Sequence, residues 1–234
     1  TEVKDLKKEF EALPSLGNRR TKLGAAPSDI DIPLEATIEK EPITIICSQK
    51  GWVRAVRGHS VDTTELKFKD GDNLAFAKLG ETTDKILFLG SNGRFYTILA
   101  DKLPRGRGHG EPIRLMIDLP NDEDVISMRI YRPQEKVLLA SDDGRGFITL
   151  SDELIAQTRN GRQVMNVSQN SRACICVKVA GDSVAVVGTN RKLLIFSIDE
   201  LPQMSRGKGV ILQKYKDGKP ADAKTFEYAD GLCW

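Results

Sequence analysis

The chain has 234 residues and a formal net charge of only +2, from 35 lysines and arginines against 33 aspartates and glutamates. This near balance excludes a uniformly basic coat, so any attraction to a polyanion must come from where the charges lie. With 40% hydrophobic and 29% charged residues, the composition is that of a soluble globular protein, and one large all-β domain plus a short extra segment accounts for the length.

The cysteine and histidine content argues against metal and redox chemistry. The four cysteines contain no C-x-x-C pair, and we interpret them as reduced thiols. Cys174 and Cys176 are expected side by side on one face of a strand, and with only two histidines a zinc site is not expected. No stretch reaches membrane-spanning length, and no leading signal segment is recognisable. The cysteines are Cys47, Cys174, Cys176 and Cys233.

The first residues differ from the rest of the chain. Apolar residues at helical spacing among Lys and Glu predict an amphipathic helix over residues 1–13. The stretch 14–34 contains several Pro and Gly and is interpreted as a linker. We therefore expect helix and linker over 1–24 and a β domain over 25–234. The apolar residues of the helix are Val3, Leu6, Phe10 and Leu13.

A short apolar run followed by a tight turn repeats four times. Asn-Gly and Asp-Gly are preferred in two-residue hairpin loops because both central residues need positive φ. The turn residues Gly51, Gly93, Gly144 and Arg191 are 42 to 51 residues apart, within the range of propeller blades. The apolar runs are 43–46, 86–89, 137–140 and 184–187.

Three further elements recur between the hairpins, each at three places: an Asp-x-Leu segment, a basic glycine-rich loop, and an acidic turn before another strand. The acidic turn is missing in the third unit, where Gln169-Asn170-Ser171 takes its place. One unit then has four strands, which is a blade. We expect four clear blades over 41–228, and a fifth could be assembled from the two ends, 25–40 and 226–234. The predicted fold is all-β and propeller-like, with about five four-stranded blades and a short N-terminal helix. The Asp-x-Leu segments are 101–103, 152–154 and 199–201, the loops 105–108, 159–162 and 206–209, and the acidic turns 70–72, 122–124 and 217–218.

The basic glycine loops are the candidate functional feature. Glycine lets the backbone approach a partner, and arginine forks match pairs of phosphate oxygens. A loop at one place in each blade would line cations along one rim, where a duplex could be bound without sequence preference. A single such loop is more often a solvated turn, and it is the threefold recurrence that favours function. The candidate DNA-binding residues are Lys50, Arg54, Arg57, Arg94, Arg105, Arg107, Arg159, Arg162, Arg206 and Lys208.

Two other classes of function remain open. A propeller scaffold could use the arginine rim to contact an acidic protein partner. An enzyme with its site in the central channel would need converging carboxylates or histidines, and the repeat offers none. His109 lies inside one basic loop without a nucleophile and carboxylate around it, so we interpret it as a turn residue.

The motifs resemble the C-terminal domains of the family that contains gyrase A and its topoisomerase IV counterpart, the β-pinwheel fold. Segment 48–54 with Gly58-His59 is similar to the first blade of the topoisomerase IV members, and segments 103–112 and 117–120 to the second. Segments 6–9 and 16–21 resemble the end of the coiled-coil arm that precedes the domain, with Leu16 where the family has an aromatic residue. The gyrase box Gln-Arg-Arg-Gly-Gly-Lys-Gly is matched at 203–209 by Gln203, Gly207, Lys208 and Gly209 and broken by Met204, Ser205 and Arg206. Segment 157–163 resembles the gyrase box more weakly.

The resemblance implies a non-catalytic domain that grips and bends duplex DNA for decatenation and relaxation, and the broken box disfavours gyrase-type wrapping. It implies no cofactor in this domain, with ATP and Mg used elsewhere in the holoenzyme. The implied partners are double-stranded DNA, the remainder of the same polypeptide and the ParE ATPase in a heterotetramer, in the bacterial cytoplasm at the nucleoid. The isolated domain is expected to be monomeric.

Overall fold

The computed structural model describes residues 2–12, 38–60, 66–106 and 108–234. The chain divides into two units, 1–37 and 38–234. In the first unit the expected helix is present as α1, Glu2–Glu11, with all of its residues exposed. The linker, the domain boundary expected after residue 24 and the arm motif at 16–21 lie outside the described residues.

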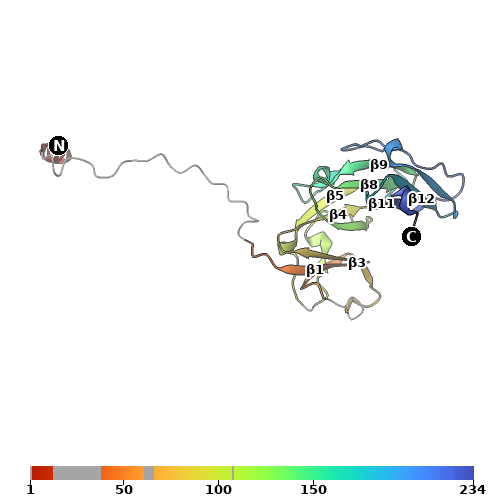
Figure 1. The fold of residues 1–234 in the computed structure, drawn as a ribbon. Coiled ribbons are helices and arrows are strands. Elements are labelled where there is room, and N and C mark those ends of the chain that lie inside the picture. The colour runs from red at the N-terminus through yellow and green to blue at the C-terminus, as the bar shows by residue number, and fades with distance from the viewer. Residues whose placement is uncertain (1, 13–37, 61–65, 107) are drawn as a thin grey trace. The chain divides into compact units, whose positions relative to one another are not determined.

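The second unit is built from four β-sheets that follow one another along the chain as blades (Figure 1). Each blade has a central hairpin, and the strand that closes its repeat pairs with the first strand of that hairpin on the inner side. The inner strands of successive blades contact one another. From the inner to the outer strand, blade 1 consists of β3 (Leu74–Glu81), β1 (Pro42–Ser48), β2 (Trp52–Arg57) and β6 (Glu111–Pro112), and blade 2 consists of β7 (Val125–Ile130), β4 (Lys85–Gly90), β5 (Arg94–Leu99) and β10 (Arg162–Gln163). Blade 3 consists of β11 (Ala173–Lys178), β8 (Lys136–Ser141), β9 (Arg145–Leu150) and β14 (Val210–Ile211). Blade 4 consists of β15 (Pro220–Phe226), β12 (Ser183–Gly188) and β13 (Leu193–Ser197).

The fourth strand of a blade is donated by the following repeat, which corrects the contiguous four-stranded unit expected from the sequence. β6 follows the β4–β5 hairpin in the chain but pairs with β2 of blade 1. In the same way β10 crosses back to β5 and β14 crosses back to β9. The strand exchange links each pair of successive blades through main-chain hydrogen bonds as well as through side-chain packing.

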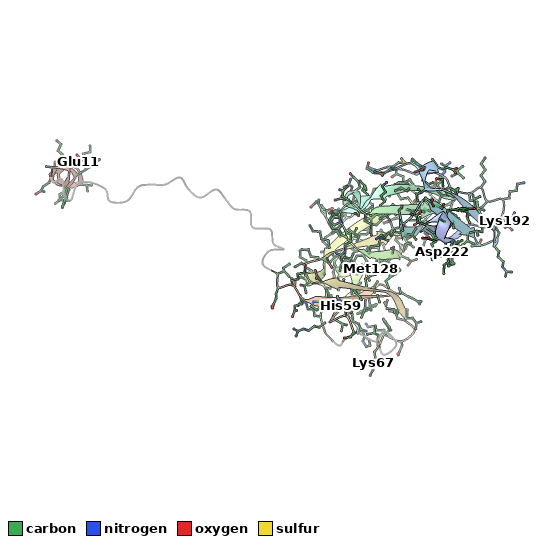
Figure 2. All side chains as sticks on the ribbon, viewed as in Figure 1. Glu11, His59, Lys67, Met128, Lys192 and Asp222 are labelled. Carbon is green, nitrogen blue, oxygen red and sulfur yellow. The ribbon has the colours of Figure 1, made fainter. Side chains whose placement is uncertain are left out.

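The hydrophobic core lies between blades, in three clusters. Alternate residues of each first strand point to opposite faces, so Ile86 and Phe88 of β4 pack toward blade 1 while Leu87 and Leu89 pack toward blade 3. Met128, labelled in Figure 2, belongs to the first of these clusters. A strand that is buried on both faces explains why the sequence shows uninterrupted apolar runs instead of alternation.

The expectation about the two neighbouring cysteines is wrong, whereas the expected number of clear blades is confirmed. A register shift between Ala173 and Ile175 lets Cys174 pack against the cluster between blades 3 and 4 and Cys176 against the one between blades 2 and 3, so the two thiols do not share a face. The described residues form the four clear blades expected over 41–228, and half of the possible fifth blade lies outside the described residues. β15 is followed by the 3₁₀-helix Tyr228–Asp230, so the C-terminal end supplies no further strand, and residues 25–37 lie outside the described part.

The Asp-x-Leu segments form short 3₁₀-helices directly after the hairpins. Each ends at a leucine that inserts into the core, and Leu103, Leu154 and Leu201 are 3%, 0% and 8% exposed. The turn redirects the chain toward the preceding blade, which is where the exchanged strand has to go. These helices are Ala100–Lys102, Ser151–Leu154 and Ile198–Glu200; a fourth, Ile113–Leu115, follows β6.

Asp142, in the β8–β9 turn, links blades 3 and 4. Burial disfavours its ionised form, but hydrogen bonds from Lys219 Nζ (2.7 Å), Ser171 Oγ (2.6 Å) and the Arg172 amide (2.9 Å) outweigh burial and lower its pKa. A carboxyl whose pKa is lowered by folding stabilises the fold above its unfolded pKa of about 3.9, and that contribution is lost as the pH falls through the folded value.

We therefore expect Asp142→Asn to lower stability at pH 7 and to flatten its loss in acid. The asparagine has no charge to lose, so the stability gap between the wild type and the variant should narrow progressively as the pH falls below about 4. Urea unfolding between pH 7 and pH 3 measures this. Asp143→Asn, in the same turn and exposed, is the matched control, and a constant gap between the wild type and Asp142→Asn at all pH values would contradict the assignment.

Candidate nucleic-acid interface

The three basic glycine loops occupy the same position in three successive blades. We define loop A as 105–110, of which residue 107 is not described, loop B as 157–161 and loop C as 204–209. Before each loop the chain is fixed to the equivalent residue of the preceding blade: the Ala55 amide donates to Pro104 O (2.9 Å), the Ala156 amide to Thr97 Oγ1 (2.9 Å), and the Ile148 amide to Pro202 O (3.0 Å). After each loop the pairing resumes two residues back along the same strand, at Val53–Glu111, Phe95–Arg162 and Gly146–Val210.

All three loops therefore project from the outer edge of a blade at one register, as expected from the repeat. Successive repeats are also joined behind them. The Asp118 amide, which follows loop A in the chain, donates to Arg159 O of loop B (2.9 Å). The Asn166 amide, which follows loop B, donates to Gly207 O of loop C (2.8 Å). Main-chain hydrogen bonds between successive repeats thus connect the three equivalent loops along the outer edge.

The last glycine of each loop allows the chain to pass close to a strand of the preceding blade. Gly110, Gly161 and Gly209 have φ of 84°, 70° and 73°. A Cβ there would lie 2.3, 2.8 and 2.1 Å from the carbonyl oxygens of Val53, Phe95 and Gly146, in the strand of the preceding blade. The backbone that these glycines approach is therefore the neighbouring blade, whereas a Cβ on Gly106 or Gly108 would meet nothing within 4 Å.

One arginine from the preceding blade holds each loop by its carbonyls. Arg54 Nη1 donates to Gly108 O in loop A, Arg94 Nη1 to Asn160 O in loop B (2.9 Å), and Arg145 Nη1 to Gly209 O in loop C (3.4 Å). Arg54 also donates to Lys67 O (3.2 Å), is only 5% exposed, and burial lowers its pKa. The structure thus gives Arg54 and Arg94 a supporting contact beneath the loops.

Arg145 was missed from the sequence. It directly follows the turn glycine of blade 3, as Arg94 does in blade 2, and this shared repeat position was the signal available. A guanidinium has five donors, so an arginine that holds a carbonyl keeps others for a phosphate.

We expect Arg145→Ala to loosen loop C without unfolding the domain. Hydrogen bonds to charged groups contribute about 1.5–3 kcal/mol, so amides of loop C should exchange with solvent at least about tenfold faster. Hydrogen exchange measures this. The control is Arg132→Ala. It removes a surface arginine that pairs with Asp84 (2.8 Å) at the open end of the β4–β5 hairpin of blade 2. Equal exchange of loop C in both variants would contradict the holding role.

The free charges are distributed unevenly among the loops. Arg105 pairs with Asp101 and Glu41 (2.5 and 3.4 Å), Arg159 lies 3.7 Å from Asp118, and Arg162 pairs with Glu153. Arg206 of loop C instead has Asn166 Oδ1 at 3.4 Å, and within the described part of the chain neither it nor the exposed Lys208 has a carboxylate at ion-pair distance. Surface ion pairs contribute only about 0–1 kcal/mol, so a phosphate can replace those carboxylates at little cost.

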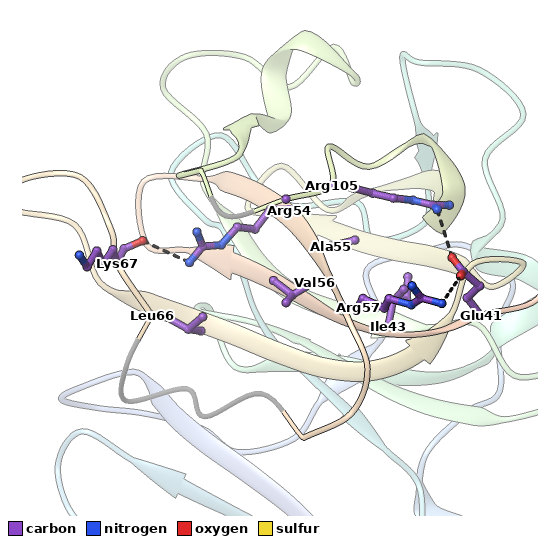
Figure 3. A pocket seen from close by; sticks show the side chains of 10 residues that line it. Glu41, Ile43, Arg54, Ala55, Val56, Arg57, Leu66, Lys67 and Arg105 are labelled. Carbon is purple, nitrogen blue, oxygen red and sulfur yellow. Dashed lines mark hydrogen bonds and ion pairs between the residues drawn. The ribbon is translucent and has the colours of Figure 1, made fainter.

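A pocket of about 850 Å³ opens beside loop A, and several cationic side chains line it (Figure 3). Arg57 and Arg105 approach Glu41 from two sides, at 3.0 and 3.4 Å, and Lys67 and Arg54 lie at the other end. A pocket of about 580 Å³ occupies the equivalent place beside loop B, where Lys85, Lys102 and Arg159 contribute its lining. Both pockets are therefore lined by positive groups, and the one beside loop A also contains the carboxylate of Glu41.

One of the candidates lies apart from the loops. Lys50 is in the β1–β2 turn, at the end of the hairpin opposite Arg57, with Nζ 3.3 Å from Asp70 O. The structure therefore does not bring Lys50 together with Arg57. Arg107 lies outside the described residues. The other eight candidates are at or next to the loops: Arg54, Arg57, Arg94, Arg105, Arg159, Arg162, Arg206 and Lys208.

Other chemistry finds little support in the described part of the chain. It contains no group of three or more His, Cys, Asp and Glu placed to hold a metal ion. Burial raises the pKa of the Cys47 and Cys174 thiols to about 12, which keeps them protonated and poorly nucleophilic at neutral pH. None of the helices within the described ranges is long and apolar enough to cross a membrane.

Outer-strand exchange between blades, with a basic loop at each exchange point, defines a propeller-like class of domain. The family described as DNA gyrase C-terminal domain, beta-propeller, matches residues 84–132, 135–172 and 182–218. These three segments begin just before or at blades 2, 3 and 4. The match covers more than half of the chain.

Known proteins agree with this match. The A subunit of DNA topoisomerase 4 from Rickettsia bellii is 44% identical over 239 residues, covering 99% of this chain and 32% of the relative. The Caulobacter vibrioides protein of the same name is 47% identical, covering 92% and 28%. The chain thus spans about a third of the length of the curated relatives it matches. The solved E. coli ParC C-terminal domain superposes with a TM-score of 0.72 at 32% identity, covering 78% of each chain. A DNA gyrase A C-terminal domain, at 17% identity and a TM-score of 0.56, covering 78% of this chain and 64% of its own, shares the fold.

The chain belongs to the family of gyrase A and ParC C-terminal domains. Within it, the similarity is greatest to the topoisomerase IV members among the relatives compared above.

Proposed function

We propose that this domain binds and bends duplex DNA for a type IIA topoisomerase, as the non-catalytic C-terminal part of ParC, the A subunit of topoisomerase IV. The observation that carries the proposal is the presence of three equivalent basic loops on the outer edges of successive blades. Loops at a fixed register offer cations at the regular intervals that a phosphate backbone requires, and contacts of this kind are independent of sequence.

Loop C supports bending over gyrase-type wrapping. It is the counterpart of the gyrase box, and two of the three positions that break the box are Met204 and Ser205. Met204 packs against the cluster between blades 2 and 3, so a side chain that would be cationic in the box is used for the core here. With fewer cations at this blade, the proposed role is to hold a bent duplex while the catalytic core, the rest of ParC with the ATP- and Mg-dependent ParE protein, carries out decatenation and relaxation in the bacterial cytoplasm.

A salt-titrated duplex-binding assay with a bend readout tests the proposal. The expected result is binding to unrelated duplexes of equal length with similar affinity, a steep salt dependence and measurable bending. No binding at low salt would overturn it. A second candidate, a scaffold for an acidic protein partner, would be favoured if a duplex failed to displace an acidic polypeptide bound to the loops.

A further inference from the structure

Blade 4 carries an excess of positive charge at its hairpin turn. In every blade this turn packs against the turn before the inner strand, because the first amide of the hairpin turn donates to a carbonyl there at 2.8 to 2.9 Å. The four residues of the hairpin turn and the six residues that end at the acceptor have a formal charge of 0, −2 and 0 in blades 1 to 3, but of +4 in blade 4. Because blades 1 to 3 form the same contact without this charge, folding does not require it. The paired segments are 49–52 with 68–73, 91–94 with 119–124, 142–145 with 167–172, and 189–192 with 214–219.

Four of the five cations in the blade 4 segments are free. Asp217 is the one carboxylate among these ten residues, and Lys219 is the cation that is already paired, to Asp142 (2.7 Å). The other four cations are exposed, and within the described ranges none of them has a carboxylate at ion-pair distance. The acidic turn expected at 217–218 therefore lies in the middle of a basic surface. We call the four free cations the blade 4 cluster: Arg191, Lys192, Lys214 and Lys216.

Hydrogen bonds hold the two segments of the cluster side by side. The Thr189 amide donates to Lys219 O (2.8 Å), and the Lys219 amide donates back to Thr189 Oγ1 (3.0 Å). Asn190 Nδ2 donates to Asp217 O (2.7 Å). The part of the cluster in the hairpin turn is therefore fixed to the part that precedes β15.

Tyr215, between the two lysines of the second segment, fixes them to the neighbouring blade. A Cβ on Gly144 or Gly188 would lie 3.2 or 2.5 Å from the Tyr215 ring, so the ring packs against the hairpin turns of both blade 3 and blade 4. This packing fixes the main chain at Lys214 and Lys216. A ring that is held in this way offers no platform on which an unpaired base could stack, which disfavours a single strand as the ligand.

Lys192 continues a row of cations along the outer edges of the blades. The Arg191 amide closes the hairpin turn of blade 4 as the amides of the turn glycines do in blades 2 and 3, so Lys192 occupies the position of Arg94 and Arg145. Those two arginines hold loops B and C. Lys192 lies exposed at the margin of the domain (Figure 2), so its ammonium group is available to a ligand.

The cluster also lies close to loop C along the chain. Lys214 is five residues after Gly209, the last residue of loop C, so their Cα atoms are at most about 18 Å apart. The segment between them includes β14, whose pairing with β9 leads the chain toward the hairpin turn of blade 3. The major groove of B-DNA is about 12 Å wide, so one duplex can contact loop C on one side of a groove and the cluster on the other.

We propose that the blade 4 cluster binds the phosphate backbone of the duplex that lies on the loops, so that the path of the DNA continues from loop C over the hairpin turn of blade 4. This inference rests on the proposed function of the domain. Exposed ammonium and guanidinium groups without carboxylate partners contact phosphates without reading the base sequence. Each phosphate contact releases counterions, so the cluster adds to the salt dependence of binding.

Neutralising the cluster in the 234-residue chain tests the inference by salt titration of duplex binding. The loss of four phosphate contacts makes the slope of log K against log salt less negative by about 3.6, and we expect a change of at least about 1.8. A smaller change, which corresponds to fewer than two contacts, overturns the inference. Asparagine is used at position 191 because it tolerates the left-handed backbone of Arg191 (φ 62°). The substitutions are Arg191→Asn, Lys192→Gln, Lys214→Gln and Lys216→Gln.

The control variant removes four charges from exposed positions away from the loops and from the cluster. It has the same net charge as the cluster variant, and we expect its slope to change by less than about 0.9. Equal changes in the two variants would show that binding follows net charge, which overturns the inference. The unfolding midpoint of each variant is measured alongside, so that a loss of folding is recognised. The control substitutions are Lys78→Gln, Arg132→Gln, Lys136→Gln and Lys178→Gln.

Protection of lysines from acetylation separates this inference from the proposed function. A bound duplex should slow the acetylation of Lys192, Lys214 and Lys216 severalfold and leave that of Lys78 unchanged. If the duplex protects Lys208 of loop C but not the three lysines of the cluster, the proposed function stands and this inference fails. If it protects neither, the proposed function fails as well. If polyglutamate protects the cluster and the duplex does not, the surface binds an acidic protein segment and the inference is overturned.

Discussion

Replacing five cations in or directly next to the loops with alanine should reduce duplex affinity on the order of a thousandfold at low salt. Each phosphate contact that is lost makes the slope of log K against log salt less negative by about 0.9, so five losses shift the slope by about 4.5. The loops are exposed and these side chains carry little of the core, so the fold should be retained. The five substitutions are Arg105→Ala, Arg159→Ala, Arg162→Ala, Arg206→Ala and Lys208→Ala.

The control must remove the same charge from elsewhere. Four lysines and one arginine away from the loops, on inner strands and in the rest of the domain, serve this purpose: Lys78, Arg132, Lys136, Lys178 and Lys224. This variant has the same net charge but should keep most of the affinity and nearly the full salt slope. If both variants lost affinity equally, binding would follow net charge and the loops would have no special role.

The charge distribution makes a finer prediction within the same series. Arg206 and Lys208 have no carboxylate partner in the described chain, whereas Arg105 has two and Arg162 has one. The double variant in loop C should therefore lose more affinity than the double variant Arg105→Ala/Arg162→Ala. The carboxylates Asp101 and Glu153 left behind by the second variant add repulsion, which sets a limit on the difference.

The blades were predictable from the sequence because their signals are local. Uninterrupted apolar runs reflect strands that are buried on both faces, and the hairpin turns need positive φ, which Gly51, Gly93 and Gly144 supply at 77°, 74° and 81°. Arg191 takes the same place with φ 62°, so the repeat position identified the turn where composition did not.

The strand exchange was not predictable, because no local property says which blade a two-residue strand joins. Glu111-Pro112 is too short to carry a periodic pattern, and its position is decided by the long-range pairing with β2. The candidate site was only partly predictable for the same reason. The sequence located the three loops, but the contacts of Arg54, Arg94 and Arg145 with loop carbonyls arise only after the neighbouring blade is in place.

Gly209→Ala should destabilise the domain by at least about 3 kcal/mol. A left-handed backbone costs a non-glycine residue about 1–2 kcal/mol, and here the added Cβ would lie 2.1 Å from Gly146 O, a main-chain atom that cannot move without disturbing β9. The strand crossing between blades 3 and 4 would have to open, and loop C would be displaced with it. Denaturant unfolding gives the stability change, and duplex affinity should fall in the same variant.

Gly108→Ala is the matched control, because it lies in loop A with nothing within 4 Å of an added Cβ. It should change stability by less than about 0.5 kcal/mol, as exposed substitutions do. The comparison separates the two uses of glycine in these loops, since Gly209 permits the crossing of two backbones while Gly108 lies in open space. If Gly209→Ala were as stable as Gly108→Ala, the close crossing of β9 by the chain leaving loop C would be absent in solution. The alignment of the loops along one edge would then lose its structural basis.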